Sequence, residues 1–214
     1  ISTIICQSLI RKIIFISSGG AVYGMPQCIP IDETRPTEPV VSYGITKLTI
    51  EKYLHLYERM HGIKAIVLRD ANPYGERQRV KTGQGAVGVF LHRGLTGKPI
   101  DIWGDGSVTR DYIHIRDVAE AAILAAEYTG QKGVFNISSG AGGSLNNLLD
   151  MLEGVLGKSI ERVYHPARAF DVPVSILSND LARAELKWAP SVSMREGIER
   201  TAEWMRLVLA RKSR

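Results

Sequence analysis

The amino-acid sequence predicts an α/β fold built on a parallel sheet, and three observations support this prediction. Continuous apolar runs recur at 12–16, 65–69 and 133–137, and strands buried on both faces of a parallel sheet have this composition. A strongly helical run, Thr46 to Met60, lies between the first two, which is the order of a βαβ unit. The small residues 17–20 follow the first run. Since ligands of open α/β sheets bind at the carboxyl ends of strands, this segment is a candidate site.

The first half of the chain continues this alternation. Residues 1–10 are apolar and look like the remnant of a helix, and a polar, Pro-punctuated loop separates the first strand from the helical run. Gly62 is a stop signal for that helix, and Asn72–Gly75 is expected to be a turn after the second strand. A helix to about Leu95 and a short strand at 99–103 are expected to follow.

The second half has the same mixture of short strands and helices. A tight turn at Gly104–Ser107 precedes a strand at 110–115, and Asp117 is expected to cap an amphipathic helix over 118–128. The remaining predicted elements are a strand at 133–137, helices at 145–156, 181–186 and 194–210, and an extended stretch at 166–173.

Composition limits the class of protein. The chain has 214 residues, of which 44% are hydrophobic and 23% charged, enough for one large or two small globular domains. No apolar run reaches the roughly 18 residues of a membrane span. Cys6 and Cys28 have no metal or redox spacing, so a reducing cytoplasm is the expected location. The net charge of +5 comes from scattered basic residues with one cluster at 206–214, which favours a solvated tail over a nucleic-acid site and suits anionic small substrates.

Tyr43 and Lys47 are the strongest candidates for catalysis. They stand four residues apart at the start of the helical run, so both side chains are expected on one helix face. Tyrosine is a poor base at its reference pKa of about 10, but a neighbouring cation favours the phenolate and lowers that pKa. The YxxxK pair is therefore a compact general base near neutral pH, although the same spacing also occurs in helices for packing alone.

Other motifs give weaker signals. Gly83–Gly88 matches GxGxxG, but the dinucleotide fingerprint needs a buried strand before it, and the polar residues 77–81 are not one. These glycines are expected instead to let a helix start approach a phosphate closely. The five histidines have no metal-ligand spacing, and His114 is expected to be a core residue. No GxSxG elbow surrounds the serines after the first strand, and Arg168 and Asp171 are by residue type alone a surface pair.

Four motifs occur in an order that resembles a known superfamily. They are Phe15-Ile16-Ser17-Ser18-Gly19-Gly20-Ala21-Val22-Tyr23-Gly24, Ser42-Tyr43-Gly44-Ile45-Thr46-Lys47, Leu68-Arg69-Asp70-Ala71-Asn72-Pro73-Tyr74-Gly75 and Trp103-Gly104-Asp105-Gly106-Ser107-Val108-Thr109-Arg110-Asp111-Tyr112-Ile113-His114-Ile115-Arg116-Asp117-Val118-Ala119. Together they resemble the extended short-chain dehydrogenase/reductases, and most closely the UDP-glucose 4-epimerase-like nucleotide-sugar epimerases and dehydratases. The resemblance runs to Trp204 and implies a Rossmann-like parallel sheet with a smaller, mostly helical substrate-binding domain. It assigns 1–75 and 108–140 to the NAD-binding domain, and 76–107 and 141–214 to the nucleotide-sugar domain.

The resemblance implies a role for each matching residue. Tyr43 is the catalytic base, Lys47 lowers its pKa and binds the nicotinamide ribose, and Ser17, Pro73 and Tyr74 border NAD. The substrate is a UDP-sugar or related nucleotide-sugar. The residues expected around it are Asn72 and Arg110 at the phosphates, Gln84, Gly85 and Ala86 around the nucleotide-sugar, and Arg168 with Asp171 at the diphosphate and the nucleoside.

The implied reaction is epimerisation by transient oxidation and re-reduction of one sugar carbon. Tyrosinate removes a hydroxyl proton while NAD+ accepts the hydride from the same carbon, the keto sugar turns over, and the hydride returns to the other face. The alternatives are a reductase or dehydratase of the same superfamily and a truncated, non-catalytic nucleotide-sugar-binding protein. A dehydratase would use Thr-Asp-Glu where this chain has Gly19-Gly20-Ala21.

Two departures from the family pattern matter. The usual Ser or Thr that bonds the reacting hydroxyl is replaced by Gly19, and Ser18 is the candidate substitute for it. The opening strand with GxxGxxG and its acidic residue are absent, so the chain is expected to be a fragment, a natural truncation or part of a longer chain, with weak NAD binding of its own. Strands that are central in the family would then be edges, which favours a homodimer.

Overall fold

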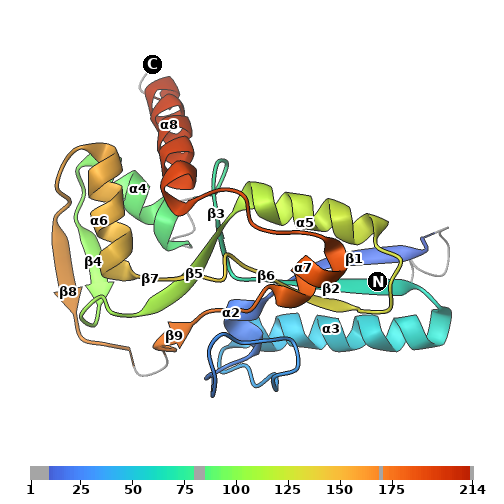
Figure 1. Cartoon of the computed structure of the whole chain (residues 1–214). Helices are drawn as coiled ribbons and strands as arrows, with labels where there is room; N and C mark the ends of the chain where they lie inside the picture. The colour runs from blue at the N-terminus through green and yellow to red at the C-terminus, as the bar shows by residue number, and fades with distance from the viewer. Residues whose placement is uncertain (1–9, 80–84, 169–170, 213–214) are drawn as a thin grey trace.

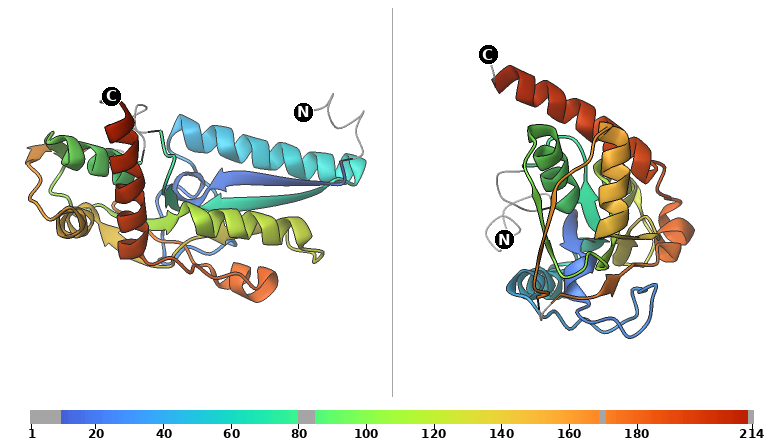
Figure 2. Two further views of the ribbon diagram at one scale, coloured as in Figure 1. Left: turned by 90° about the horizontal axis from the view of Figure 1, so that it is seen from above. Right: turned by 90° about the vertical axis from the view of Figure 1, so that its left-hand side faces the viewer.

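A three-stranded parallel sheet lies between helices on its two faces (Figure 1). The computed structural model describes residues 10–79, 85–168 and 171–212. Seen from above, one long helix covers each face of the sheet (Figure 2). The strands in sheet order are β1 (Lys12–Ser18), β2 (Lys64–Asp70) and β6 (Val134–Ile137), and the covering helices are α3 (Ser42–His61) and α5 (Ile115–Glu127). This arrangement confirms the predicted parallel α/β fold.

The register of the strands brings the carboxyl ends of β1 and β2 together. Ser17 is the Cα partner of Arg69, and Ser18 is the partner of Asp70. Asp70 is also the partner of Ile137 on β6. Within the described ranges β1 pairs with β2 alone, so its other edge has no strand beside it in that part of the chain.

A second group of elements lies beyond the carboxyl ends of these strands (Figure 1). β5 lies between β3 and β7, and because β3 follows β2 after one residue, this pairing joins the second group to the central sheet. The elements are β3 (Asn72–Tyr74), β5 (Thr109–His114), β7 (Gly142–Ser144) and β9 (Val174–Ser175), the pair β4 (Ile100–Trp103) and β8 (Arg162–His165), and the helices α4 (Ala86–Thr96), α6 (Leu145–Leu156) and α8 (Met194–Lys212).

Two large apolar clusters hold these groups together, and a smaller third one packs α3 on the central sheet. The first belongs to the central sheet and α5, and also takes in α2 (Gly19–Val22) and α7 (Asp180–Leu186), with Phe135 and Trp188 fully buried. The second joins α4, α6 and α8 around residues such as Leu149. The late segment that contains α7 therefore packs with the central sheet, and the division of the chain into two domains stays a prediction.

Two local expectations are wrong. The turn expected after β2 is the short strand β3, which pairs in parallel with β5. Asp117 does not cap α5, because the helix begins at Ile115 and the His114 side chain accepts a hydrogen bond from Arg116 N as the N-cap. Asp117 is instead buried in the first turn, where its carboxylate accepts from both the amide and the hydroxyl of Ser191.

Three short strands were not expected, and other expectations stay untested. The sequence does not predict β7, β8 or β9, which contain 3, 4 and 2 residues. The helical remnant expected at 1–10 falls outside the described residues apart from its last position. No helix in the described ranges combines the length and the apolar character needed to cross a bilayer. Cytoplasmic location stays a prediction.

Candidate functional site

Tyr43 and Lys47 lie together at the start of α3. Lys47 Nζ donates to the Ile16 carbonyl oxygen at 2.8 Å and stands 5.7 Å from the centroid of the Tyr43 ring. A side chain at Gly44 would place its Cβ 2.4 Å from the Ala21 carbonyl oxygen, so glycine is what allows this helix start to approach α2. Tyr43 is 55% exposed. The ammonium is thus held at the carboxyl end of β1, and the phenol beside it is exposed to solvent.

A buried polar network holds Ser17 beneath this end of the sheet. Ser17 Oγ donates to Glu51 at 2.5 Å, and Glu51 forms a buried ion pair with Arg69 at 2.7 Å. Arg69 also donates to the Tyr23 hydroxyl at 2.9 Å, and that hydroxyl donates to Asn136 at 2.8 Å. Burial raises the pKa of Tyr23. Ser17 therefore anchors α3 to β1 in this structure, and its role beside the cofactor stays a prediction.

Ser18 and Gly19 mark the step from β1 to α2. A Cβ added at Gly19 would lie 2.3 Å from Leu177 Cδ1 and 3.1 Å from the Arg69 carbonyl oxygen. A Ser or Thr at this position would therefore require Leu177 to move. Ser18 precedes α2 and makes no side-chain capping bond to it.

A cavity of about 420 Å³ lies among β3, β4, β5 and the start of α4. Tyr43, Lys47, Ser17 and Ser18 are outside its lining, at the carboxyl end of β1 and the start of α3, and Gln84 lies outside the described residues. The structure brings together in this lining eight residues that were predicted from the sequence: Asn72, Pro73, Tyr74, Gly85, Ala86, Arg110, Arg168 and Asp171.

Backbone carbonyls position two polar side chains of the cavity. Asn72 Nδ2 donates to the Asp111 carbonyl oxygen at 2.9 Å, and Arg110 Nη1 donates to the Val172 carbonyl oxygen at 2.6 Å. Burial lowers the pKa of Arg110, and the charge of Asp171 acts in the opposite direction. Arg110 makes no ion pair within the described residues, so its positive charge is available to an anionic ligand.

Sequence reasoning missed three aromatic residues in this cavity, Phe90 on α4 and the strand residues Trp103 and Tyr112. Trp103 ends β4 and is 39% exposed; its ring centroid lies 3.8 Å from the Arg168 guanidinium carbon and 5.3 Å from the His165 ring centroid. Tyr112 follows Arg110 by two residues on β5. Its buried hydroxyl has no hydrogen-bond partner among the described residues, and burial raises its pKa to about 12. The sequence contained a signal for Trp103 and Tyr112, since each is an aromatic residue in an expected strand. Trp103 stands beside a predicted turn, and Tyr112 stands beside the predicted ligand-binding Arg110.

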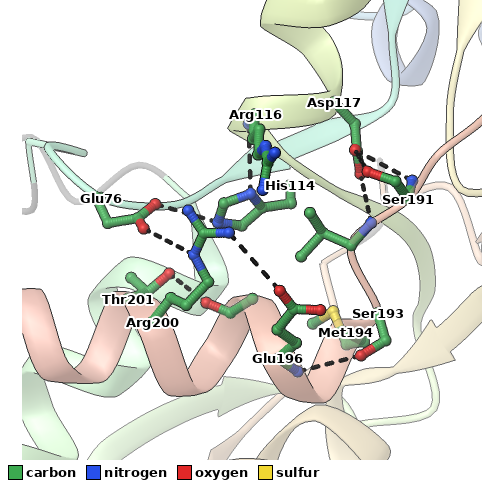
Figure 3. A network of polar contacts seen from close by, with 12 residues as sticks. Glu76, His114, Arg116, Asp117, Ser191, Ser193, Met194, Glu196, Arg200 and Thr201 are labelled. Carbon is green, nitrogen blue, oxygen red and sulfur yellow. Dashed lines mark hydrogen bonds and ion pairs between the residues drawn. The ribbon is translucent and has the colours of Figure 1, made fainter.

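A polar network through Glu76 ties Arg200 of α8 to His114 of β5 (Figure 3). His114 Nε2 lies 3.1 Å from a Glu76 carboxylate oxygen, and the other oxygen accepts from Arg200 Nε at 3.2 Å. The Tyr74 ring packs edge-on against the His114 ring with 5.4 Å between centroids. His114 is 1% exposed, and burial lowers its pKa despite the nearby Glu76. The expectation of a core histidine is confirmed.

Residues 3–138, well over half of the chain, match the model of the NAD dependent epimerase/dehydratase family. The chain belongs to this family. A UDP-glucose 4-epimerase of Mycolicibacterium smegmatis is 36% identical over 92% of this chain and 63% of its own length. A dTDP-4-dehydro-6-deoxyglucose reductase of Escherichia coli is 37% identical over 92% of this chain and 62% of its own.

Solved structures of this family have the same fold. The UDP-glucose 4-epimerase of Thermotoga maritima with UDP-glucose superposes with a TM-score of 0.89 at 42% identity, over 93% of this chain and 64% of that one. The Thermus thermophilus UDP-glucose 4-epimerase in complex with NAD gives a TM-score of 0.84 at 34% identity, over 92% and 64%. The chain therefore spans less than two thirds of the length of these relatives.

Proposed function

We propose that the protein is an NAD-dependent nucleotide-sugar epimerase that binds a UDP-hexose in the cavity between β3, β4, β5 and α4. The observation that supports this most is the gathering of Arg110, Arg168, Asn72 and Trp103 around one cavity bordered by the N-terminus of α4. Arginines and a helix N-terminus attract a diphosphate, and the face of the Trp103 ring holds the Arg168 guanidinium beside the cavity. The Thermotoga maritima relative was crystallised with UDP-glucose.

The residues at the carboxyl end of β1 suit the chemistry of this reaction. When bound, NAD+ supplies the acceptor for the sugar hydride. Tyr43 as a phenolate accepts the proton of the sugar hydroxyl, and the Lys47 ammonium stabilises that phenolate. Lys47 spends one donor on Ile16, which leaves two of the three protons of an ammonium for ribose hydroxyls. Ser18 is the hydroxyl donor nearest in sequence to Gly19.

Replacing Tyr43 by Phe tests this chemistry. We expect interconversion of UDP-glucose and UDP-galactose to fall by about 10²-fold or more, because the general base is removed. UDP binding, measured by calorimetry, should stay unchanged. Tyr53→Phe is the matched control, since Tyr53 is a similarly exposed tyrosine of the same helix. Full activity in Tyr43→Phe would show that the mechanism is wrong.

Two other functions have a specific observation in their favour. The similarity to an Escherichia coli reductase favours net reduction of a nucleotide-sugar, which would consume NADH in proportion to product, whereas epimerisation consumes none. Gly19 favours a nucleotide-sugar-binding protein without turnover, because no hydroxyl fits there unless Leu177 moves. That protein would gain thermal stability from UDP and interconvert nothing. If millimolar UDP leaves the Tm unchanged, neither the epimerase nor the binding protein stands.

We further propose a homodimer formed through the outer face of α3. Ile45, Leu56 and Met60 are exposed, and their spacing puts them on one stripe of the helix. A second copy of α3 packed across this stripe buries the same patch on both subunits, as a two-fold interface requires. Leu56→Glu should convert a dimer to a monomer in sedimentation equilibrium, while the distant exposed Lys158→Glu should not. A wild-type monomer at about 100 µM, far above the Kd of a stable dimer, would exclude this interface.

A further inference from the structure

Asp70 is a buried carboxyl group that the proposed chemistry leaves unused. It ends β2 between Ser18 on β1 and Ile137 on β6 and is 2% exposed. Neither of its oxygens has a hydrogen-bond partner among the described residues. Nearly all buried polar groups in native proteins are hydrogen-bonded, so this exception calls for an explanation. Because side chains alternate along a strand, Asp70 lies on the face opposite Arg69, which bonds Glu51 of α3.

Lys47 is the charge that acts on Asp70. Burial raises the pKa of Asp70 to about 8, and the Lys47 ammonium offsets part of that rise. Lys47 is itself held by Ile16 at the neighbouring strand end. Other charged residues of α3 and α5 are exposed or paired. The remaining titratable groups on elements packed against β2 have other partners or are exposed. Glu51 pairs with Arg69, and the Tyr23 hydroxyl bonds Arg69 and Asn136. Asp117 bonds Ser191, Lys12 bonds the carbonyl oxygens of Ala126 and Tyr128, and Tyr43 is exposed on α3.

We propose that Asp70 is a positioning residue that sets the net charge around the nicotinamide ring, and with it the preference for oxidised or reduced cofactor. The inference rests on the proposed function, in which the nicotinamide end of NAD lies beside Lys47. The oxidised ring is cationic and the reduced ring is neutral. While Asp70 keeps its proton, it adds no negative charge beside the ring, so the oxidised ring is less stabilised and is the stronger hydride acceptor. When Asp70 ionises, its carboxylate offsets Lys47 and stabilises the oxidised ring.

The affinities for NAD+ and NADH between pH 6 and pH 10 test this inference without catalysis. In the wild type we expect the preference for NAD+ over NADH to rise several-fold across this range, because ionisation adds one negative charge that attracts the cationic ring. Asp70→Asn cannot ionise, so it should lack this contribution to the preference, and any dependence on pH that remains belongs to Tyr43. Lys47→Met should bind both forms more weakly and move the transition to higher pH, because the cation that favours ionisation is gone. Asp150→Asn, on the exposed side of α6, should behave as the wild type.

A second measurement separates this inference from the proposed function. The carboxyl carbon of Asp70, identified in the NMR spectrum by its loss in Asp70→Asn, should titrate near pH 8 without any cofactor. A titration near pH 4 overturns the inference whether or not NAD binds. Identical pH profiles of the NAD+ preference in wild type and Asp70→Asn overturn it as well, while leaving the epimerase proposal intact. Failure of both NAD+ and NADH to bind overturns the epimerase proposal and the inference with it. Asp70→Leu repeats the comparison with an apolar side chain of similar size.

Discussion

Replacing Asp70 by Asn is expected to stabilise the protein, by an amount that grows as the pH rises. Asn has nearly the shape of a protonated aspartic acid but cannot ionise. The pKa of Asp70 is about 8 in the folded protein, against 3.8 for an unperturbed aspartate. Because the folded value is the higher one, the native state keeps a proton that the unfolded chain releases. The free energy of unfolding is therefore greatest below about pH 4 and falls until about pH 8.

The size of this effect follows from the separation of the two pKa values. One pKa unit corresponds to about 1.36 kcal/mol. The Asp70 carboxyl loses its proton near pH 4 in the unfolded chain but still holds it at pH 7 in the native state, about 3 pH units higher. The wild type therefore loses about 4 kcal/mol of unfolding free energy between pH 4 and pH 7 through this one group. We expect Asp70→Asn to be more stable than the wild type by about that amount at pH 7 and nearly equal to it at pH 4. Urea unfolding followed by tryptophan fluorescence, with Trp188 buried in the core, measures both values.

Asp111 provides the matched control for this experiment. It is also a buried aspartate, but its carboxylate accepts hydrogen bonds from Ser139, Gly140 and Leu177. Asp111→Asn should lower the unfolding free energy by about 1–3 kcal/mol, because donors that faced a carboxylate lose an acceptor. The reasoning fails if Asp70→Asn has the same dependence of stability on pH as the wild type. It also fails if Asp70→Asn is destabilised at pH 7 as Asp111→Asn is.

Three further changes test the packing and the site. Glu51→Gln should lower the unfolding free energy by about 3–5 kcal/mol in urea denaturation, because it leaves the buried Arg69 without its charge partner. A loss below about 1 kcal/mol would contradict the buried ion pair. Gly19→Ser should cost about 1–3 kcal/mol by overpacking against Leu177, and the added change Leu177→Ala should recover part of it rather than add to it. Trp103→Ala should weaken UDP binding about two- to thirtyfold in calorimetry, since it removes a cation–π contact of about 0.5–2 kcal/mol that holds Arg168 at the cavity, and an unchanged Kd would show that Arg168 does not depend on this contact.

The central fold could be predicted because its strands have strong local signals. The run Ile13–Ile16 and the run Ala65–Leu68 are apolar throughout, which is a property of the segment itself. The short strands β7 and β9 have no such signal. They form because Thr109 and Arg110 on β5 meet partners from residues 142–144 on one side and 174–175 on the other, and such pairing depends on the assembled fold. Asp117 was misplaced for a related reason, since the actual N-cap, His114, belongs to a strand.

The candidate site was predictable in part through the order of its motifs. Arg110 and Arg168 are far apart in the sequence, and only the resemblance to a family brought them together before the structure did. Trp103 and Asp70 were missed because their importance lies in their surroundings. Trp103 matters through its contact with Arg168, and Asp70 through burial without a partner, and neither property is present in a segment read alone.

The structure gives a physical reason why position 19 is glycine. Leu177 N donates to the Asp111 carboxylate, while the Asp111 carbonyl oxygen accepts from Asn72 in the wall of the cavity. Leu177 is therefore held by the same residue that positions Asn72, and its side chain fills the space a Cβ at Gly19 would need. A hydroxyl at position 19 could be gained only if the Leu177 side chain moved out of this space. We propose Ser18 as the hydroxyl that acts on the substrate from this turn, since the Ser17 hydroxyl is bonded to Glu51, so Ser18→Ala should lower kcat in an epimerase and leave a binding protein unaffected.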